Sequence, residues 1–257
     1  MSTSQVTSFY YSGQGSVLLA ERDVSGNALG FTPVGNVTAL TLGIEVSKLE
    51  HKESVSGSRG IDKTLIQEVN VSMSMVMESL FKENLAVALY GSSSSVAAGS
   101  ISDEQVVARH DKWVALSEPN LSAVVIGDDA VPTNTYIEGT DYLLNAAAGS
   151  FMALSTGGIA DAQTVFVDAT TGGHDVVEGF ISSAAPERWL RFEGLNTAEG
   201  DKTVVVDVYK FAIDPLAELA LINEELAEMT VEGSVLQDTT KPTGGTSQYF
   251  RQQYVVV

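Results

Sequence analysis

Residues 37–77 read VTALTLGIEVSKLEHKESVSGSRGIDKTLIQEVNVSMSMVM, and their periodicity decides the fold class. Apolar and polar residues alternate from Val37 to Lys48 and again from Leu65 to Met77. A period of two is typical of half-buried β-strands, so the two runs predict an antiparallel hairpin. The polar side chains that share one face of this hairpin are Thr41, Glu45, Glu68, Asn70, Ser72 and Ser74.

The stretch between the two runs, KLEHKESVSGSRGIDK at 48–63, is far longer than a hairpin turn of about 2–5 residues. Its Ser and Gly content predicts a flexible loop. The chain has a formal net charge of -19, yet four of its 14 basic residues lie here. We therefore expect a surface that pairs with another surface, and a solvated loop tip is the alternative. The charged residues of this loop are Lys48, Glu50, Lys52, Glu53, Arg59, Asp62 and Lys63.

After the hairpin, apolar residues recur at helical spacing in ESLFKENLAVALYG, which predicts a helix near residues 79–90 with Gly91 at the C′ position. The low-complexity run SSSSVAAGS then marks a boundary. From about 101 to 172, short β-type runs alternate with Pro, Gly and Asp clusters, as in a small β domain. We interpret residues 95–172 as a domain inserted into a larger one.

Strand patterns resume in VVEGFIS, ERWLRFEGLN and KTVVVDVYKFAI. Asp214 and Pro215 then suit the N-cap and N1 positions of a short second helix, and a further strand is expected near MTVEGSVLQD. The tail, TTKPTGGTSQYFRQQYVVV, predicts a peripheral arm that could add a strand elsewhere. The resulting domains are 1–94, the insertion at 95–172, and 173–257 with this C-terminal arm.

Composition excludes several classes of protein. An acidic chain lacks the Lys and Arg that displace counterions from a phosphate backbone, so nucleic-acid binding is not expected. No apolar run is long enough to span a bilayer, and the first residues lack the pattern of a signal peptide. There are no cysteines, and the three histidines are not at metal-site spacing. No nucleophile or phosphate-loop motif occurs. We therefore expect no enzyme activity, metal or cofactor.

Taken together, the paired long strands with their loop KLEHKESVSGSRGIDK, the helix ending NLAVALYG, and the stretch WLRFEGLNTAEGDKTVVVDVYKFAIDPLAELALINEELAEMTVEGSVLQD resemble the major tail tube protein of long-tailed (siphovirus-type) bacteriophages. These segments cover roughly residues 30–92 and 176–240. The resemblance rests on their order and texture, because no single motif is diagnostic. The block at about 95–172 looks like the outward-facing inserted domain that some members carry.

The resemblance implies a mainly β subunit: a tail-tube-type β-sandwich with one or two short flanking helices, a long hairpin loop and an inserted small β domain. Such subunits form hexameric rings that stack into a hollow tube, through which DNA passes as non-binding cargo. Its other partners would be the tape measure, tail tip and tail terminator proteins, with no membrane involved. The protein would be assembled in the host bacterial cytoplasm and reside in the virion tail.

Within that resemblance, the loop at 48–63 becomes the contact between stacked rings, and the polar face of the hairpin becomes a candidate lining of the lumen. Two other functions remain open. One is a virion surface or adhesin-like β module in which the 101–172 block binds a receptor or glycan. The other is a polysaccharide-cleaving enzyme, for which no set of residues is evident.

Overall fold

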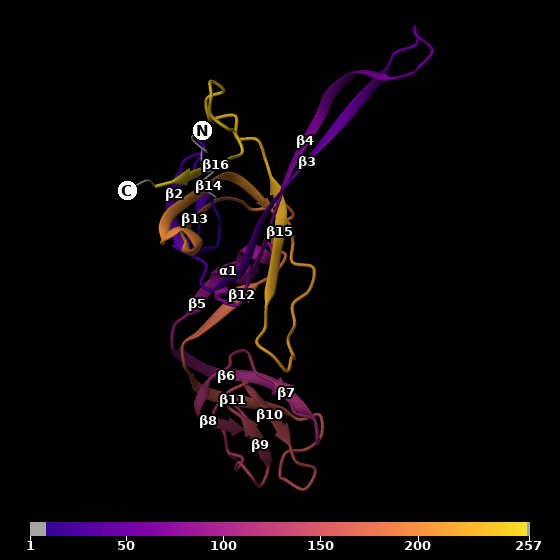
Figure 1. The fold of residues 1–257 in the computed structure, drawn as a ribbon. Coiled ribbons are helices and arrows are strands. Elements are labelled where there is room, and N and C mark those ends of the chain that lie inside the picture. The colour runs from indigo at the N-terminus through magenta and orange to yellow at the C-terminus, as the bar shows by residue number, and fades with distance from the viewer. Residues whose placement is uncertain (1–8, 256–257) are drawn as a thin grey trace. The chain divides into compact units, whose positions relative to one another are not determined.

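A computed structural model describes residues 9–255 of the chain (Figure 1). It divides into two compact units: unit 1 contains the chain up to Ser92 and from Val177 onward, and unit 2 contains Ser93–Val176. For comparison with unit 2, the inserted domain expected from the sequence spans residues 95–172. The expected mainly β fold is confirmed, since nearly every regular element is an antiparallel strand.

Unit 1 is built on one eight-stranded sheet in the order β2-β1-β13-β14-β15-β4-β3, with β16 also paired to β14. All of its pairings are antiparallel. Its strands are β1 (Gly13–Arg22), β2 (Ala28–Pro33), β3 (Val37–Lys52), β4 (Ile61–Met77), β13 (Glu187–Asn196), β14 (Lys202–Ile213), β15 (Met229–Val235) and β16 (Phe250–Tyr254).

The sheet divides at β14, because two strands share one edge of it. Val204–Val208 pair with β16, whereas Phe211–Ile213 pair with β15. The expected strand near MTVEGSVLQD is therefore confirmed as β15. The C-terminal tail pairs with the chain's own sheet through β16. The sequence alone did not identify the strand with which this tail would pair.

The core of unit 1 follows from the period-two pattern of its strands. β15 alternates buried and exposed residues along its whole length, and Met73, Met75 and Met77 of β4 are buried in the same way. These side chains pack with Phe211 and Ile213 of β14 in one apolar cluster. A strand with every second residue in the core and the others in water gains stability from one face only.

The predicted first helix is confirmed as α1 (Lys82–Ala88), shorter than expected. The prediction that Gly91 is its C′ glycine is wrong, because the left-handed conformation falls on Tyr90, with φ 52°. The Tyr90 hydroxyl donates a hydrogen bond of 2.6 Å to the Ile213 carbonyl, which holds this residue in place. Gly91 is needed for another reason: a Cβ there would overlap the backbone carbonyl of Glu178.

The predicted second helix after Asp214 and Pro215 is wrong, because residues 214–228 form no helix or strand. Leu216 packs against the core, but Leu221, Ile222 and Leu226 are exposed. A short helix is marginal in water unless tertiary packing buries one face, and nothing in the described chain covers this one.

The predicted long loop is also shorter than expected. β3 continues to Lys52 and β4 begins at Ile61, so only residues 53–60 connect them. Strand pairing extends through most of the stretch that the sequence predicts to be loop, with a register shift between Ser47 and Lys48. Figure 1 shows this hairpin extending well beyond the other strands of unit 1.

Unit 2 has its own core, which includes Phe151, Ile126 and Ile159, between two three-stranded antiparallel sheets ordered β6-β11-β8 and β7-β10-β9. Two strands in the connecting segments, β5 and β12, pair with each other. The bounds are β5 (Ser92–Val96), β6 (Gly99–Val107), β7 (Trp113–Ala115), β8 (Leu121–Gly127), β9 (Tyr142–Asn145), β10 (Ser150–Ala153), β11 (Thr164–Thr171) and β12 (His174–Glu178), and a 3-10 turn, η1, spans Thr197–Glu199.

A buried ion pair ties the end of β1 to the segment after β15. The Arg22 guanidinium lies 2.8 Å from the Asp238 carboxylate, and both side chains are almost fully buried. Thr240 donates to the same carboxylate through its hydroxyl at 2.7 Å and its backbone N–H at 3.1 Å. Arg22 also reaches the half-exposed Glu187 at 3.5 Å.

Replacing one partner of this pair tests its role in the fold. We expect Asp238→Ala to lower the free energy of unfolding by about 3 kcal/mol, because it leaves the buried guanidinium with only the longer contact to Glu187. The control Glu187→Ala removes a more exposed carboxylate, which also pairs with Lys210, and should lower it by no more than about 1 kcal/mol. Urea denaturation of both variants measures the difference, and equal losses would contradict the assignment.

Candidate functional site

The outer part of the β3–β4 hairpin, residues 44–69, is the candidate site and is called the arm below. At the base of the hairpin, Leu40 pairs with Met75 and Leu42 with Met73, and these side chains pack in the core of unit 1. The same apolar face continues outward along the arm without a cover. Its exposed apolar residues are Ile44, Val46, Ile66 and Val69 on this face, and Leu49, Val55, Ile61 and Leu65 elsewhere on the arm.

The arm also carries four cations, which are Lys48, Lys52, Arg59 and Lys63. Within the described residues none of the four forms an ion pair. The acids in the stretch 48–63 are Glu50, Glu53 and Asp62. Two of them, Glu53 and Asp62, are bound by other groups of the arm. Asp62 lies 2.6 Å from the Nδ1 atom of His51. The four cations thus stay available for contacts outside the arm, in a chain of formal charge -19.

Glu53 is the main hydrogen-bond acceptor within the loop at 53–60. Its carboxylate accepts hydrogen bonds from the hydroxyls of Ser56 and Ser58 and from the backbone N–H groups of Val55 and Ser56. Gly57 and Arg59 adopt left-handed backbone angles that complete the turn. The sequence prediction of a flexible loop did not include this carboxylate, which organises the Ser and Gly residues.

These hydrogen bonds favour the charged form of Glu53. The Ser56 hydroxyl contributes most, followed by the backbone N–H of Ser56 and the Ser58 hydroxyl, and together they lower the pKa of Glu53 from 4.5 to about 2. The carboxylate thus stays charged at any pH the folded protein normally meets. The carboxylate accepts its hydrogen bonds from donors of the same loop.

The six predicted polar residues lie together on one face of the hairpin. The register pairs Thr41 with Ser74 and Glu45 with Asn70, and Ser72 and Glu68 occupy the alternate positions of β4 between and beyond them. The Thr41 hydroxyl donates to the Ser74 carbonyl at 3.4 Å. The remaining member, Glu68, lies opposite Ser47 just before the register shift.

Sequence reasoning missed a third strand on this face. β15 pairs with β4, so its exposed residues Thr230, Glu232 and Ser234 extend the same surface. The Ser74 hydroxyl lies 3.5 Å from the Glu232 carboxylate. The alternation in MTVEGSV identifies the strand, but nothing in one sequence identifies its neighbour. The polar face, as used below, consists of Thr41, Glu45, Glu68, Asn70, Ser72, Ser74, Thr230, Glu232 and Ser234.

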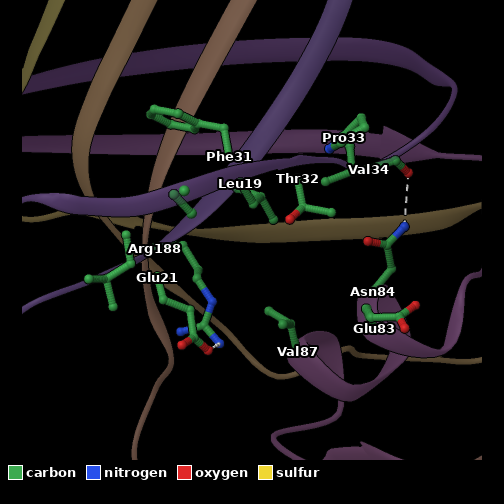
Figure 2. Close-up of a pocket in the computed structure, with 13 residues that line it drawn as sticks. Leu19, Glu21, Phe31, Thr32, Pro33, Val34, Glu83, Asn84, Val87 and Arg188 are labelled. Atoms are coloured by element: carbon green, nitrogen blue, oxygen red, sulfur yellow. Dashed lines mark hydrogen bonds and ion pairs between the residues drawn. The ribbon is translucent and has the colours of Figure 1, made fainter. Parts of the chain in front are cut away.

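A depression of about 510 Å³ lies between the β1–β2 hairpin and α1 (Figure 2). Its charged groups Arg188 and Glu21 point toward each other at 3.2 Å. Asn84 donates to the Val34 carbonyl at 2.9 Å and so joins α1 to the end of β2. The first pair joins β13 to β1, and the Asn84 hydrogen bond fastens the helix to the sheet. Glu83 also lines the depression.

The three histidines lie in separate environments. His51 contacts Asp62 on the arm, His110 contacts the Ile159 carbonyl at 2.8 Å, and His174 lies 3.3 Å from Glu118. Among residues 9–255, no three His, Cys, Asp or Glu side chains gather closely enough to hold a metal ion. In the same range, no helix has the length and apolar character needed to cross a membrane.

The low pKa of Glu53 gives a test of the loop. Because the folded pKa is depressed, the stabilisation from these hydrogen bonds is complete above about pH 4.5 and is lost as the pH falls through about 2. We therefore expect the ¹³C chemical shift of the Glu53 carboxyl to stay constant from about pH 6 to about pH 3.5, a window in which an ordinary glutamate titrates. In Ser56→Ala the midpoint should move upward, and a midpoint near 4.5 in the unaltered chain would contradict this account.

Comparison with curated proteins gave no match to the chain. Comparison with protein families gave one. Residues 10–253, which include the arm, the polar face and all of unit 2, match one family over nearly the whole length of the protein. The chain therefore belongs to the family described as "Protein of unknown function UCP028589".

Proposed function

We propose that the protein is a structural subunit that forms hexameric rings, and that these rings stack into the hollow tail tube of a long-tailed bacteriophage. The observation that carries this proposal is the arm. It extends from unit 1 with apolar side chains and cations that the described chain leaves uncovered. Exposed apolar surface of this kind, rimmed by charge, is typical of protein–protein interfaces.

The energetics favour apolar contact as the source of stability between copies. Full burial of one Val, Leu or Ile side chain contributes about 1.5–3 kcal/mol, and the arm carries several that are about half exposed. An exposed ion pair contributes only about 0–1 kcal/mol. The four cations therefore set the register and the partner, while the apolar residues supply most of the affinity.

The polar face has the character that a DNA conduit requires. Its charged members are Glu45, Glu68 and Glu232, all acidic, and its other members are small hydroxyl and amide residues. Such a surface offers no counterion-releasing contacts to a polyanion, so DNA would slide past it. We assign this face to the lumen, with DNA as transit cargo rather than as a ligand.

The sandwich element of the proposal is supported by the division of the unit 1 sheet at β14. Leu40, Leu42 and Met73 of the hairpin line the same hollow of about 760 Å³ as Leu190 and Phe192 of β13. In this proposal the two parts of the sheet are the two layers of a β-sandwich, and the shared apolar lining supports that assignment. In this proposal the tape measure, tail tip and tail terminator proteins contact the tube ends, and the protein resides in the virion tail.

Negative-stain electron microscopy tests the proposal. The purified protein, concentrated at low and at high salt, should form six-fold rings or hollow tubes. Compact monomers that remain unassembled even with tail-tip seed complexes would contradict it. If such monomers also bound glycans, the adhesin-like alternative would replace the tube.

A charge reversal tests the arm. Arg59→Glu should raise the protein concentration needed for tube formation at least about fivefold, because loss of an attraction of about 1 kcal/mol per contact alone gives that factor and the reversed charge adds repulsion. The matched control is Arg109→Glu, an equal change at an exposed position in unit 2. Normal tubes from the Arg59 variant, with an unchanged monomer fold by circular dichroism, would remove the loop from the interface.

A further inference from the structure

Residues 216–228, LAELALINEELAE, are called the acidic leucine segment below. Its first residue, Leu216, packs against the core of unit 1, and most of the residues that follow are exposed. Leu221, Ile222 and Leu226 are 84%, 96% and 83% exposed. The segment contains four glutamates and neither lysine nor arginine, and it has no helix or strand. Three large aliphatic side chains in water within six positions indicate a surface that is covered in the functional state.

Both ends of the acidic leucine segment are fastened to unit 1. The Leu216 N–H donates to the Ala88 carbonyl at 2.9 Å, and the Asp214 N–H donates to the Glu232 carbonyl at 2.9 Å. On the other side, Met229 begins β15 and is buried. The exposed residues are therefore held between two fixed points, and the surface that they form is presented by the fold.

The glutamates of this segment are Glu218, Glu224, Glu225 and Glu228. In the part of the chain that the structure describes, none of them has an ion-pair partner. The arm presents the complementary set, with four unpaired cations beside exposed apolar residues such as Leu65 and Ile66. Unpaired cations on one surface and unpaired carboxylates on the other, each beside exposed apolar residues, are thus complementary within the described chain.

We infer that the acidic leucine segment of one copy is the docking surface for the arm of a second copy. This inference rests on the proposed stacking of rings and names the acceptor for the arm. The donor and acceptor are different surfaces, so the contact is head-to-tail and repeats from copy to copy. Apolar residues of the arm cover Leu221, Ile222 and Leu226, while its cations pair with the glutamates around them.

Another acidic loop with an exposed apolar residue serves as a comparison. Val131 in unit 2 is 86% exposed and follows Asp128 and Asp129. Asp128, however, is bound by the backbone N–H groups of Thr133 and Asn134 and by the Asn134 side chain. The Asp128 carboxylate accepts hydrogen bonds from its own loop. No such side-chain hydrogen bond is seen for the glutamates of the acidic leucine segment in the described residues.

Disulfide cross-linking between two variants tests the docking, since the chain has no cysteine of its own. Ile66→Cys, on the arm, and Leu226→Cys, on the segment, are made in separate chains, mixed under assembly conditions and oxidised. We expect at least tenfold more disulfide heterodimer than from the same arm variant mixed with Val131→Cys. The linked peptides are identified by mass spectrometry, and circular dichroism checks that each variant is folded.

A charge exchange gives a second readout that random collision would not produce. Glu224→Lys with Glu225→Lys in the segment should lower the heterodimer yield at least fivefold. Lys52→Glu with Arg59→Glu in the arm should restore it when the two altered surfaces are combined. Failure of this restoration, with all chains folded, would contradict the assigned charge pairing.

The outcomes separate this inference from the proposed function. Tubes that form without the heterodimer overturn the docking surface and leave the tube proposal standing. The heterodimer without rings or tubes supports the docking surface and contradicts the tube. A yield no higher than that of the Val131 control overturns the inference whatever particles are seen.

Discussion

The antiparallel pairing of β3 with β4 is the interaction on which the rest of unit 1 depends. Side chains alternate across this ladder, so a slip of one residue would exchange its polar and apolar faces. Burial of Met73, Met75 and Met77 in the core makes such a slip costly and fixes the register at the base. The ladder continues to Lys52 and Ile61, but the register shifts after Ser47 and after His51 reset which side chains share a face at the far end of the arm.

Charge is distributed unevenly over this framework, and the hydrogen-bond pattern increases the unevenness. Glu53 and Asp62 lie among the cations of the arm, but the first is bound by its own loop and the second by His51. The acids of the polar face and of residues 216–228 keep their charges available. A chain with a large negative charge thereby gathers four unpaired cations on one hairpin, and such a cluster can orient the association of like-charged copies.

The strands and the hairpin could be predicted from the sequence because a period of two directly reports burial on one face. The length of the arm could not, since KLEHKESVSGSRGIDK has no sustained alternation and reads as loop until backbone pairing is seen. The prediction of a second helix was wrong for a related reason. The leucines in 216–228 have helical spacing, but such spacing gives a stable helix only where a partner surface buries one face. The polar face was found in part, because Thr230, Glu232 and Ser234 join it through the neighbour relation of β15 and β4.

The pairing of β5 with β12 has an architectural consequence. The chain leaves unit 1 at Ser92 and returns at Val177 through two strands that lie side by side, so unit 1 requires only that these two points stay close together. A short turn could meet that requirement as well as a whole folded unit, and the entropy of closing the longer excursion grows only slowly with its length. Unit 2 is therefore an exchangeable module: its sequence can diversify, be enlarged or be lost while the scaffold that carries the arm remains intact.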